Sequence, residues 1–216
     1  MTGSEKIWYQ KFRLHPASLL DRFTVFFIRL FANYFWIVVD IFSYHNASIA
    51  SWYHRSIGKE YHRECESFGI KKDIKILHIG CGSYPLTELC LAQNSAVHVV
   101  GIDKNKRAVN RAREVVKRHH LEKKITIKQA HGSFFPVESF DVIIVSSCAL
   151  PKLEIMRHLF SSTKKHAKII VRDMDIAVQH IRKTIEEYPS MVLNREVHHL
   201  APFRLIGWTA FYMQKK

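Results

Sequence analysis

Residues 75–103, KILHIGCGSYPLTELCLAQNSAVHVVGID, decide the fold. Residues 75–79 are a short apolar run typical of a buried strand, and a glycine turn over 80–85 then precedes a helical pattern over 86–93. A second apolar run over 97–102 predicts another strand, and Asp103 follows it. This order of strand, glycine turn, helix and strand predicts a βαβ unit with parallel strands.

The same alternation continues along the rest of the chain. We expect further strands over 125–128, 141–145 and 168–171, and helices over 105–120, 153–164 and 175–187. The tail, residues 203–215, alternates apolar and polar residues around Gly207 and predicts an antiparallel hairpin at the edge of the sheet. Residues 73–216 are therefore expected to form one α/β domain, a parallel sheet with helices on both faces.

Residues 1–72 differ from this pattern and predict a helical, aromatic-rich N-terminal extension. Residues 19–44 contain nine aromatic residues and no glycine or proline, which predicts a long helix, and residues 48–68 predict a second one. The polar positions of the long helix lie on one narrow stripe: Arg22, Arg29, Asn33 and Asp40.

These charges argue against a simple transmembrane span, because a charged side chain at the bilayer centre costs about 2.5–3.5 kcal/mol. Two interpretations of residues 19–44 stay open. The helix either lies in the plane of a membrane surface, or it packs on the second domain as a lid.

Composition narrows the class of protein. The chain has 216 residues, a net charge of +14 and four widely spaced cysteines, which excludes a disordered chain and gives no sign of a disulfide framework. A cytoplasmic setting is expected, and no metal is expected because the histidines form no chelating pattern.

The positive charge indicates an acidic partner, either nucleic acid or an anionic membrane surface. Residues 104–118 hold seven of the basic side chains, which predicts either a solvated helix face or a docking surface for phosphate groups. With the apolar helix over 19–44, this pattern favours an anionic membrane surface and makes nucleic acid the less favoured partner. The basic residues are Lys104, Lys106, Arg107, Arg111, Arg113, Lys117 and Arg118.

The glycine turn also predicts a ligand. Gly80 and Gly82 follow a strand and precede a helix, and Asp103 ends the next strand 23 positions after Gly80. Glycine lets a backbone approach a ligand closely, and a carboxylate at this spacing accepts hydrogen bonds from ribose hydroxyls. Because Pro85 stands where a dinucleotide site has its third glycine, the pattern favours S-adenosylmethionine over NAD or FAD. The alternative is a turn that only packs helix on sheet.

Residues 75–172 resemble the class I S-adenosylmethionine-dependent methyltransferases. The resemblance rests on KILHIGCGSYP for the glycine loop, VVGID for the ribose-binding acid and SFDVIIVSS for the fourth strand. It implies a Rossmann-like, seven-stranded methyltransferase sheet. Within that superfamily, GCGSYPLTELCLA is also similar to the loop of nicotianamine synthases, which transfer an aminocarboxypropyl group, and VRDM adds a weaker similarity.

The resemblance implies a set of site residues. In many members an acidic residue binds the adenine, and here His131 takes that slot, with the carbonyl of Ala130 as an alternative acceptor. The cofactor-binding residues implied are Ile79, Gly80, Cys81, Gly82, Asp103, Lys104, Ala130, His131 and Ser146. The acceptor is expected beyond the fourth strand, at Ser146, Ser147, Cys148 and Leu150, with Tyr53, His54, Tyr61 and His62 as candidates from the extension.

No catalytic base is identified by sequence. Cys148 lacks the preceding proline of the cytosine-5 methyltransferases, so a buried small residue is the better interpretation. The expected function is methyl transfer to a small or lipophilic acceptor at a membrane surface. The alternatives are aminocarboxypropyl transfer and a non-catalytic binding or scaffold protein.

Overall fold

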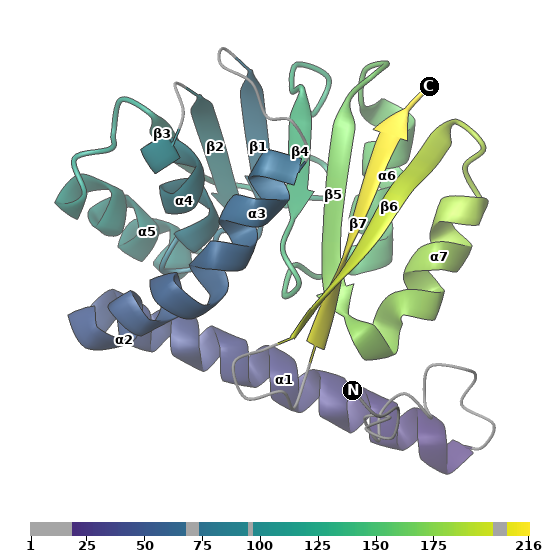
Figure 1. The fold of residues 1–216 in the computed structure, drawn as a ribbon, viewed down its shortest axis with the longest axis horizontal. Helices are drawn as coiled ribbons and strands as arrows, with labels where there is room; N and C mark the ends of the chain where they lie inside the picture. The colour runs from purple at the N-terminus through teal and green to yellow at the C-terminus, as the bar shows by residue number, and fades with distance from the viewer. Residues whose placement is uncertain (1–18, 68–73, 95–96, 201–206) are drawn as a thin grey trace, which may run out of the picture.

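The computed structural model describes residues 19–67, 74–94, 97–200 and 207–216. It contains a seven-stranded sheet in the order β3-β2-β1-β4-β5-β7-β6 (Figure 1). The first five strands are parallel to one another, and β7 is antiparallel to both β5 and β6. The strands are β1 (Lys75–Ile79), β2 (His98–Asp103), β3 (Ile125–Gln129), β4 (Val142–Val145), β5 (Lys168–Met174), β6 (Met191–Leu200) and β7 (Gly207–Lys215). The predicted α/β methyltransferase-type sheet is confirmed.

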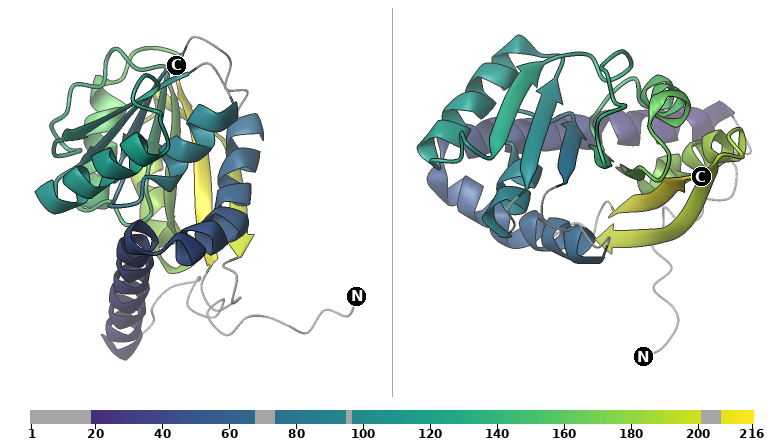
Figure 2. Two further views of the ribbon diagram at one scale, coloured as in Figure 1. Left: turned by 90° about the vertical axis from the view of Figure 1, so that its left-hand side faces the viewer. Right: turned by 90° about the horizontal axis from the view of Figure 1, so that it is seen from above.

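Helices cover both faces of the sheet (Figures 1 and 2). One face of β1, β4 and β5 packs on two helices, α6 (Lys152–Ser162) and α7 (Val178–Glu186). A short 3-10 turn, η3 (Asp175–Ala177), precedes α7. The other face carries α4 (Leu86–Asn94) and α5 (Lys106–Arg118). Because both faces are covered, the central strands β1 and β4 are almost wholly apolar and buried.

One sequence expectation at the sheet edge is wrong. The predicted hairpin within residues 203–215 is instead a single strand, β7, whose partner at the edge is β6. Sequence periodicity missed β6 because its stretch NREVHH holds a single apolar residue, and a register shift between Leu193 and Arg195 interrupts the alternation of the strand. Residues 203–206, with which the expected hairpin began, lie outside the described residues.

The described part of the N-terminal extension, residues 19–67, is helical, as predicted. Helix α1 (Leu19–His45) runs along the edge where the parallel strands end (Figures 1 and 2). The chain then returns through α2 (Ala47–Tyr53), a π-helical turn η2 (His54–Gly58) and α3 (Lys59–Ser67). The end of α1 is fastened to α5, since Arg118 Nη1 donates to the carbonyl of Tyr44 at 3.0 Å and its guanidinium lies 4.6 Å from the Tyr44 ring centre.

A buried ion pair fastens α3 to the sheet. Arg172 of β5 donates from Nε to Glu64 Oε2 at 2.8 Å, and both side chains are almost fully buried. Arg172 Nη1 also donates to Thr87 Oγ1 of α4 at 2.9 Å, and its guanidinium lies 3.7 Å from the centre of the Tyr61 ring. The extension is therefore built into the core next to the carboxyl ends of the strands.

Candidate functional site

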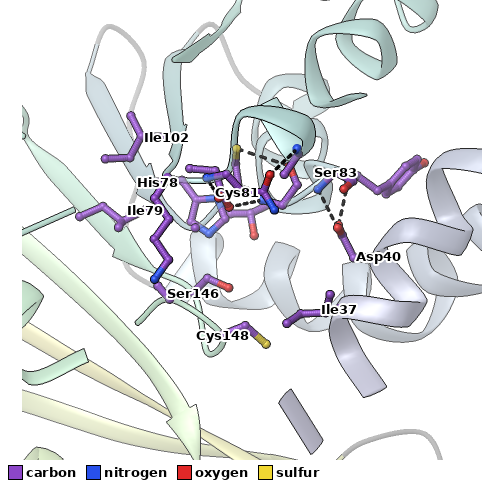
Figure 3. Close-up of a pocket in the computed structure, with 18 of the residues that line it drawn as sticks. Ile37, Asp40, His78, Ile79, Cys81, Ser83, Ile102, Ser146 and Cys148 are labelled. Atoms are coloured by element: carbon purple, nitrogen blue, oxygen red, sulfur yellow. Dashed lines mark hydrogen bonds between the residues drawn. The ribbon is translucent and has the colours of Figure 1, made fainter. Parts of the chain in front are cut away.

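A cavity of about 460 Å³ lies at the carboxyl ends of β1, β2 and β4 (Figure 3). Its floor is the glycine turn between β1 and α4, and α1 covers it from the opposite side with Trp36, Ile37, Asp40 and Ile41. This is the edge at which open α/β sheets bind their ligands. Helix α1 therefore lies over the cavity and contributes to its lining.

The backbone of the glycine turn leaves no room for a side chain at Gly80 or at Gly82. Gly80 has φ +89° and Gly82 has φ +68°. A Cβ on Gly80 would lie 2.9 Å from the Ala149 Cβ, and one on Gly82 would lie 2.7 Å from Asp40 Oδ1. The amides of Gly80 and Cys81 both donate to the carbonyl of Ile102, at 2.8 and 3.1 Å, which ties the turn to β2. The result is a bare backbone cradle that a ligand can approach closely.

Asp103 lies at the end of β2, beside this cradle. Its Oδ2 accepts from the Gly82 amide at 3.1 Å and its Oδ1 accepts from the Asn105 amide at 2.8 Å. These two bonds fix the carboxylate at the edge of the cavity, where the sequence places a ribose-binding acid. Lys104 follows it and donates from Nζ to the carbonyl of Leu150 at 3.0 Å.

A second carboxylate reaches the turn from α1. Asp40 Oδ2 accepts from the Ser83 amide at 2.6 Å and Oδ1 accepts from the Tyr84 amide at 2.8 Å (Figure 3). Burial raises the pKa of Asp40 from 3.8 to about 7, although the two amide bonds work in the opposite direction. Sequence reasoning placed Asp40 on the polar stripe of α1 but not in the site. The available signal was a lone acid in the apolar half of that helix, which needs a partner when buried.

A smaller chamber of about 60 Å³ adjoins the main cavity and shares several lining residues with it. Four aromatic residues line it, Trp36, Tyr53, Tyr61 and Trp208, and we call it the aromatic chamber. Trp36 stacks on Tyr53 with ring centres 6.1 Å apart. Arg172, already paired with Glu64, lies in its wall. The lining residues that both spaces share are Trp36, Tyr53, Tyr61, Ser146 and Cys148.

The groups lining this chamber hold their protons at neutral pH. Burial raises the pKa of Cys148 and that of Tyr61 to about 12 each, and raises the pKa of Tyr53 well above 10. Cys148 is therefore a thiol and not a thiolate nucleophile.

Most of the residues predicted from sequence line these two spaces. Those lining the main cavity are Ile79, Gly80, Cys81, Gly82, Asp103, Lys104, Ala130, Ser146, Cys148, Leu150, Tyr53 and Tyr61, and Ser147 lines the small chamber. His131 is not among the lining residues, and its Nδ1 accepts from the Ser133 amide at 3.3 Å. His54 packs edge-on against Tyr84 outside both linings, and His62 lines neither space.

In the described part of the chain, no three His, Cys, Asp or Glu side chains gather as metal ligands would. The cavity residues instead fit an organic cofactor. The cradle leaves its backbone open to a ligand, the volume suits a nucleoside with an amino acid tail, and the Asp103 carboxylate at the cavity edge suits the hydroxyls of a sugar.

Comparison with known proteins identifies relatives of this chain. Residues 70–213 match a family model described as a methyltransferase domain. An uncharacterized protein of Haemophilus influenzae is 25% identical over 153 residues, which cover 68% of this chain and 59% of that protein. The sterol 24-C-methyltransferase erg-4 of Neurospora crassa is 36% identical over 93 residues, which cover 40% of this chain and 24% of that protein. The chain thus spans less than two thirds of the length of these curated relatives.

Solved structures share the fold at low sequence identity. A glutamate-to-glutamine mutant of MtNAS in complex with S-adenosylmethionine matches 98% of this chain and 85% of its own, with a TM-score of 0.78 and 14% identity. An S-adenosylmethionine-dependent methyltransferase from Aquifex aeolicus matches 71% of this chain and 89% of its own, with a TM-score of 0.56 and 15% identity. The first of these matches extends over the N-terminal helices.

Proposed function

The chain belongs to the methyltransferase domain family, and we propose that it transfers the methyl group of S-adenosylmethionine to a small or lipophilic acceptor at an anionic membrane surface. Its cofactor is S-adenosylmethionine. The observation that carries the proposal is the pair of connected spaces, because the bare glycine cradle and Asp103 suit the cofactor and the aromatic chamber suits an acceptor.

The residues of the main cavity hold and orient the cofactor. The turn from Gly80 to Gly82 receives the amino acid tail, and the Asp103 carboxylate accepts hydrogen bonds from the ribose. When bound, S-adenosylmethionine supplies a methyl group made electrophilic by its sulfonium. Lys104 and Ala130 line the cavity beyond Asp103, in the direction of the base.

The aromatic chamber aligns the acceptor and excludes water. Trp36, Tyr53 and Tyr61 line both spaces, so an acceptor in the chamber would lie next to a cofactor held in the main cavity. A bond from the acceptor lone pair to the methyl carbon forms as the carbon–sulfur bond breaks, which leaves S-adenosylhomocysteine. Alignment supplies much of the rate for an acceptor that is already deprotonated. Tyr53, Tyr61 and Cys148 keep their protons and shape the space.

Product analysis tests this function. The protein is incubated with S-adenosylmethionine and an extract of lipids and small metabolites, and the nucleoside products are separated. We expect S-adenosylhomocysteine to accumulate, and an Asp103→Ala variant to lose most of this product because its ribose contact is missing. Accumulation of methylthioadenosine, or no product with any fraction of the extract, would rule out methyl transfer.

Aminocarboxypropyl transfer of the nicotianamine synthase type is the second candidate. It is favoured by one observation, the match of MtNAS to 98% of this chain, whereas the Aquifex methyltransferase matches 71%. The additional coverage falls on the N-terminal helices that close the cavity. In this reaction the bond that breaks joins sulfur to the aminocarboxypropyl carbon, so methylthioadenosine is the nucleoside released.

The outer side of α1 supports the membrane part of the proposal. One described stretch, Phe26–His45, is long and apolar enough to cross a membrane, with a mean hydropathy of 1.5 and 18% of it buried. Because Trp36 and Asp40 of this stretch line the cavity, we propose that α1 lies in the membrane plane instead of crossing it. Its exposed large side chains are 46–68% accessible: Phe23, Phe26, Phe27, Leu30, Phe31, Tyr34, Ile37 and Phe42.

Basic side chains lie next to this apolar surface. The contacts of Arg118 and Arg111 with Tyr44 hold α5 against the end of α1. Arg107 and Arg111 also line the cavity mouth, and among the described residues neither is ion-paired. A basic residue near an anionic bilayer contributes about 1 kcal/mol to binding. The two helices together present apolar and cationic groups around the opening, which suits the cytoplasmic face of a membrane.

Vesicle binding tests this placement. We expect the protein to sediment with vesicles of phosphatidylserine and phosphatidylcholine, and less with phosphatidylcholine alone. The double variant Phe27→Asp/Phe31→Asp is expected to bind more than about tenfold more weakly, because burying one such ring contributes about 1.5–3 kcal/mol. Lys165→Asp, beyond α6 at the opposite edge of the sheet, is the control and is expected to keep nearly all binding. Equal sedimentation of the double variant and the wild type would assign α1 the role of a lid alone.

A further inference from the structure

The cofactor carries charges that its site has to match. S-adenosylmethionine has a sulfonium and an α-ammonium group at one end, together with one carboxylate. Among the described residues that line the main cavity, the carboxylates are Asp40 and Asp103. The side chains of the turn itself, from Gly80 to Ser83, bring no anion to the cationic end of the ligand.

Asp103 is already assigned to the other end of the ligand. It lies at the end of β2, its two oxygens accept from the Gly82 and Asn105 amides, and it is expected to bind the ribose. Asp40 approaches the same turn from the opposite side, on α1. Its Oδ1 is 2.7 Å from the point where a Gly82 Cβ would stand, so the carboxylate borders the space that the glycine leaves open.

The Asp40 carboxylate has acceptor capacity left. Each of its oxygens takes one backbone amide proton, from Ser83 or from Tyr84, and an ionised carboxylate offers about four lone-pair sites. The Ser83 hydroxyl also hydrogen-bonds to this carboxylate, so three of the four sites are taken. The remaining site is left for a donor that reaches it from the cavity, an ammonium or a water molecule.

We propose that Asp40 binds the α-ammonium group of S-adenosylmethionine, so that α1 supplies part of the cofactor site. This inference rests on the proposed function. It explains why the apolar half of α1 keeps an acid at the point where it crosses the glycine turn. It also makes the lid and the cofactor depend on each other, because the cofactor then bridges the turn and α1.

The electrostatics of the free site agree with this role. Burial, with a smaller contribution from Asp103, raises the pKa of Asp40 to about 7. A bound ammonium favours the ionised carboxylate and lowers that pKa again. The other titratable or charged side chains facing the cavity are Tyr53 of α2, Tyr61 of α3, His78 of β1, Cys81 and Tyr84 of the turn, Cys148 after β4, and Lys104, Arg107 and Arg111 at the mouth.

Calorimetry with three nucleosides tests the assignment. S-adenosylmethionine and S-adenosylhomocysteine carry the ammonium group, and methylthioadenosine lacks the whole amino acid tail. We expect Asp40→Asn to weaken binding of the first two at least about tenfold, as for the loss of a charge-assisted hydrogen bond of about 1.5–3 kcal/mol, and to change methylthioadenosine binding less than twofold. Ser43→Ala, at the buried Ser43 whose hydroxyl bonds its own helix at Val39, is the matched control.

The pH dependence of the wild type tests the same point without a variant. Asp40 is ionised above about pH 7 and protonated below it. Affinity for S-adenosylmethionine is therefore expected to fall as the pH is lowered from 7.5 to 5.5, while methylthioadenosine binding stays level.

Two results would overturn the assignment. If Asp40→Asn weakens the binding of all three nucleosides equally, Asp40 only shapes the turn. If the binding of all three is unchanged, Asp40 neither binds the ammonium group nor shapes the turn. If the wild type binds methylthioadenosine and S-adenosylmethionine equally well at every pH, the ammonium has no partner. If the wild type binds none of the three, the cofactor site itself is wrong, and this outcome is distinct from a failure of Asp40.

Discussion

Replacing Gly80 with alanine is expected to reduce S-adenosylmethionine affinity about 30-fold or more, because the left-handed backbone costs a side chain about 1–2 kcal/mol and overpacking adds about 1–3 kcal/mol. Gly80 has φ +89°, and its new methyl would stand 2.9 Å from the Ala149 Cβ and 3.1 Å from the Ser146 Cβ. Ser146 is tied to the end of β1 by a 2.9 Å bond from its amide to the carbonyl of Ile79, so the turn would have to move. Calorimetric titration measures the loss.

A second substitution separates the two causes. Gly80→Ala combined with Ala149→Gly removes the closest clash but keeps the unfavourable backbone angle. We expect this double variant to recover part of the lost affinity, with circular dichroism spectra like those of the wild type. Wild-type affinity in Gly80→Ala alone would contradict the assignment of residues 80–82 as the cofactor cradle.

Removing the charge of Glu64 is expected to destabilise the fold by about 3–5 kcal/mol, the usual cost of leaving one partner of a buried ion pair uncompensated. Glu64 Oε2 lies 2.8 Å from Arg172 Nε and 2.7 Å from Nη2, and both side chains are almost fully shielded from water. Glu64→Gln keeps the size of the side chain. Its free energy of unfolding, measured by urea denaturation, reports the loss.

An exposed ion pair serves as the control for Glu64. Arg157 and Glu187 lie 3.5 Å apart with 50% and 42% of their side chains exposed, so Glu187→Gln should change the free energy of unfolding by less than about 1 kcal/mol. A Glu64→Gln variant as stable as this control would contradict the account of how α3 is fastened to the sheet. If Glu64→Gln destabilises the fold, we also expect it to weaken acceptor binding, because Arg172 lies in the wall of the aromatic chamber.

The central part of the fold could be predicted from the sequence because the same local signals repeat there. Each parallel strand is a short apolar run, and the turn from Gly80 to Pro85 and the acid at position 103 mark the cofactor edge at known spacing. The edge strand β6 gave no such signal. Its middle stretch, NREVHH, is polar, and its pairing with β7 becomes visible only once both strands lie in the sheet.

The candidate site was predicted unevenly for the same reason. Residues of the turn and of the strand ends follow from local motifs, whereas Asp40, Trp36 and Trp208 reach the cavity or chamber from segments far apart in the chain. Helical periodicity placed Asp40 on a polar stripe of α1, but it could not predict which part of the protein that stripe contacts. The bonds from Ser83 and Tyr84 to Asp40 join residues more than forty positions apart, and only tertiary structure supplies them.

Titration of the wild-type chain with S-adenosylmethionine is the most direct test of the central claim, that the cavity between the glycine turn and α1 is a cofactor site. We predict saturable binding at one site per chain, weakened about 30-fold or more in Gly80→Ala. No binding at millimolar cofactor by a correctly folded wild-type protein would contradict the account.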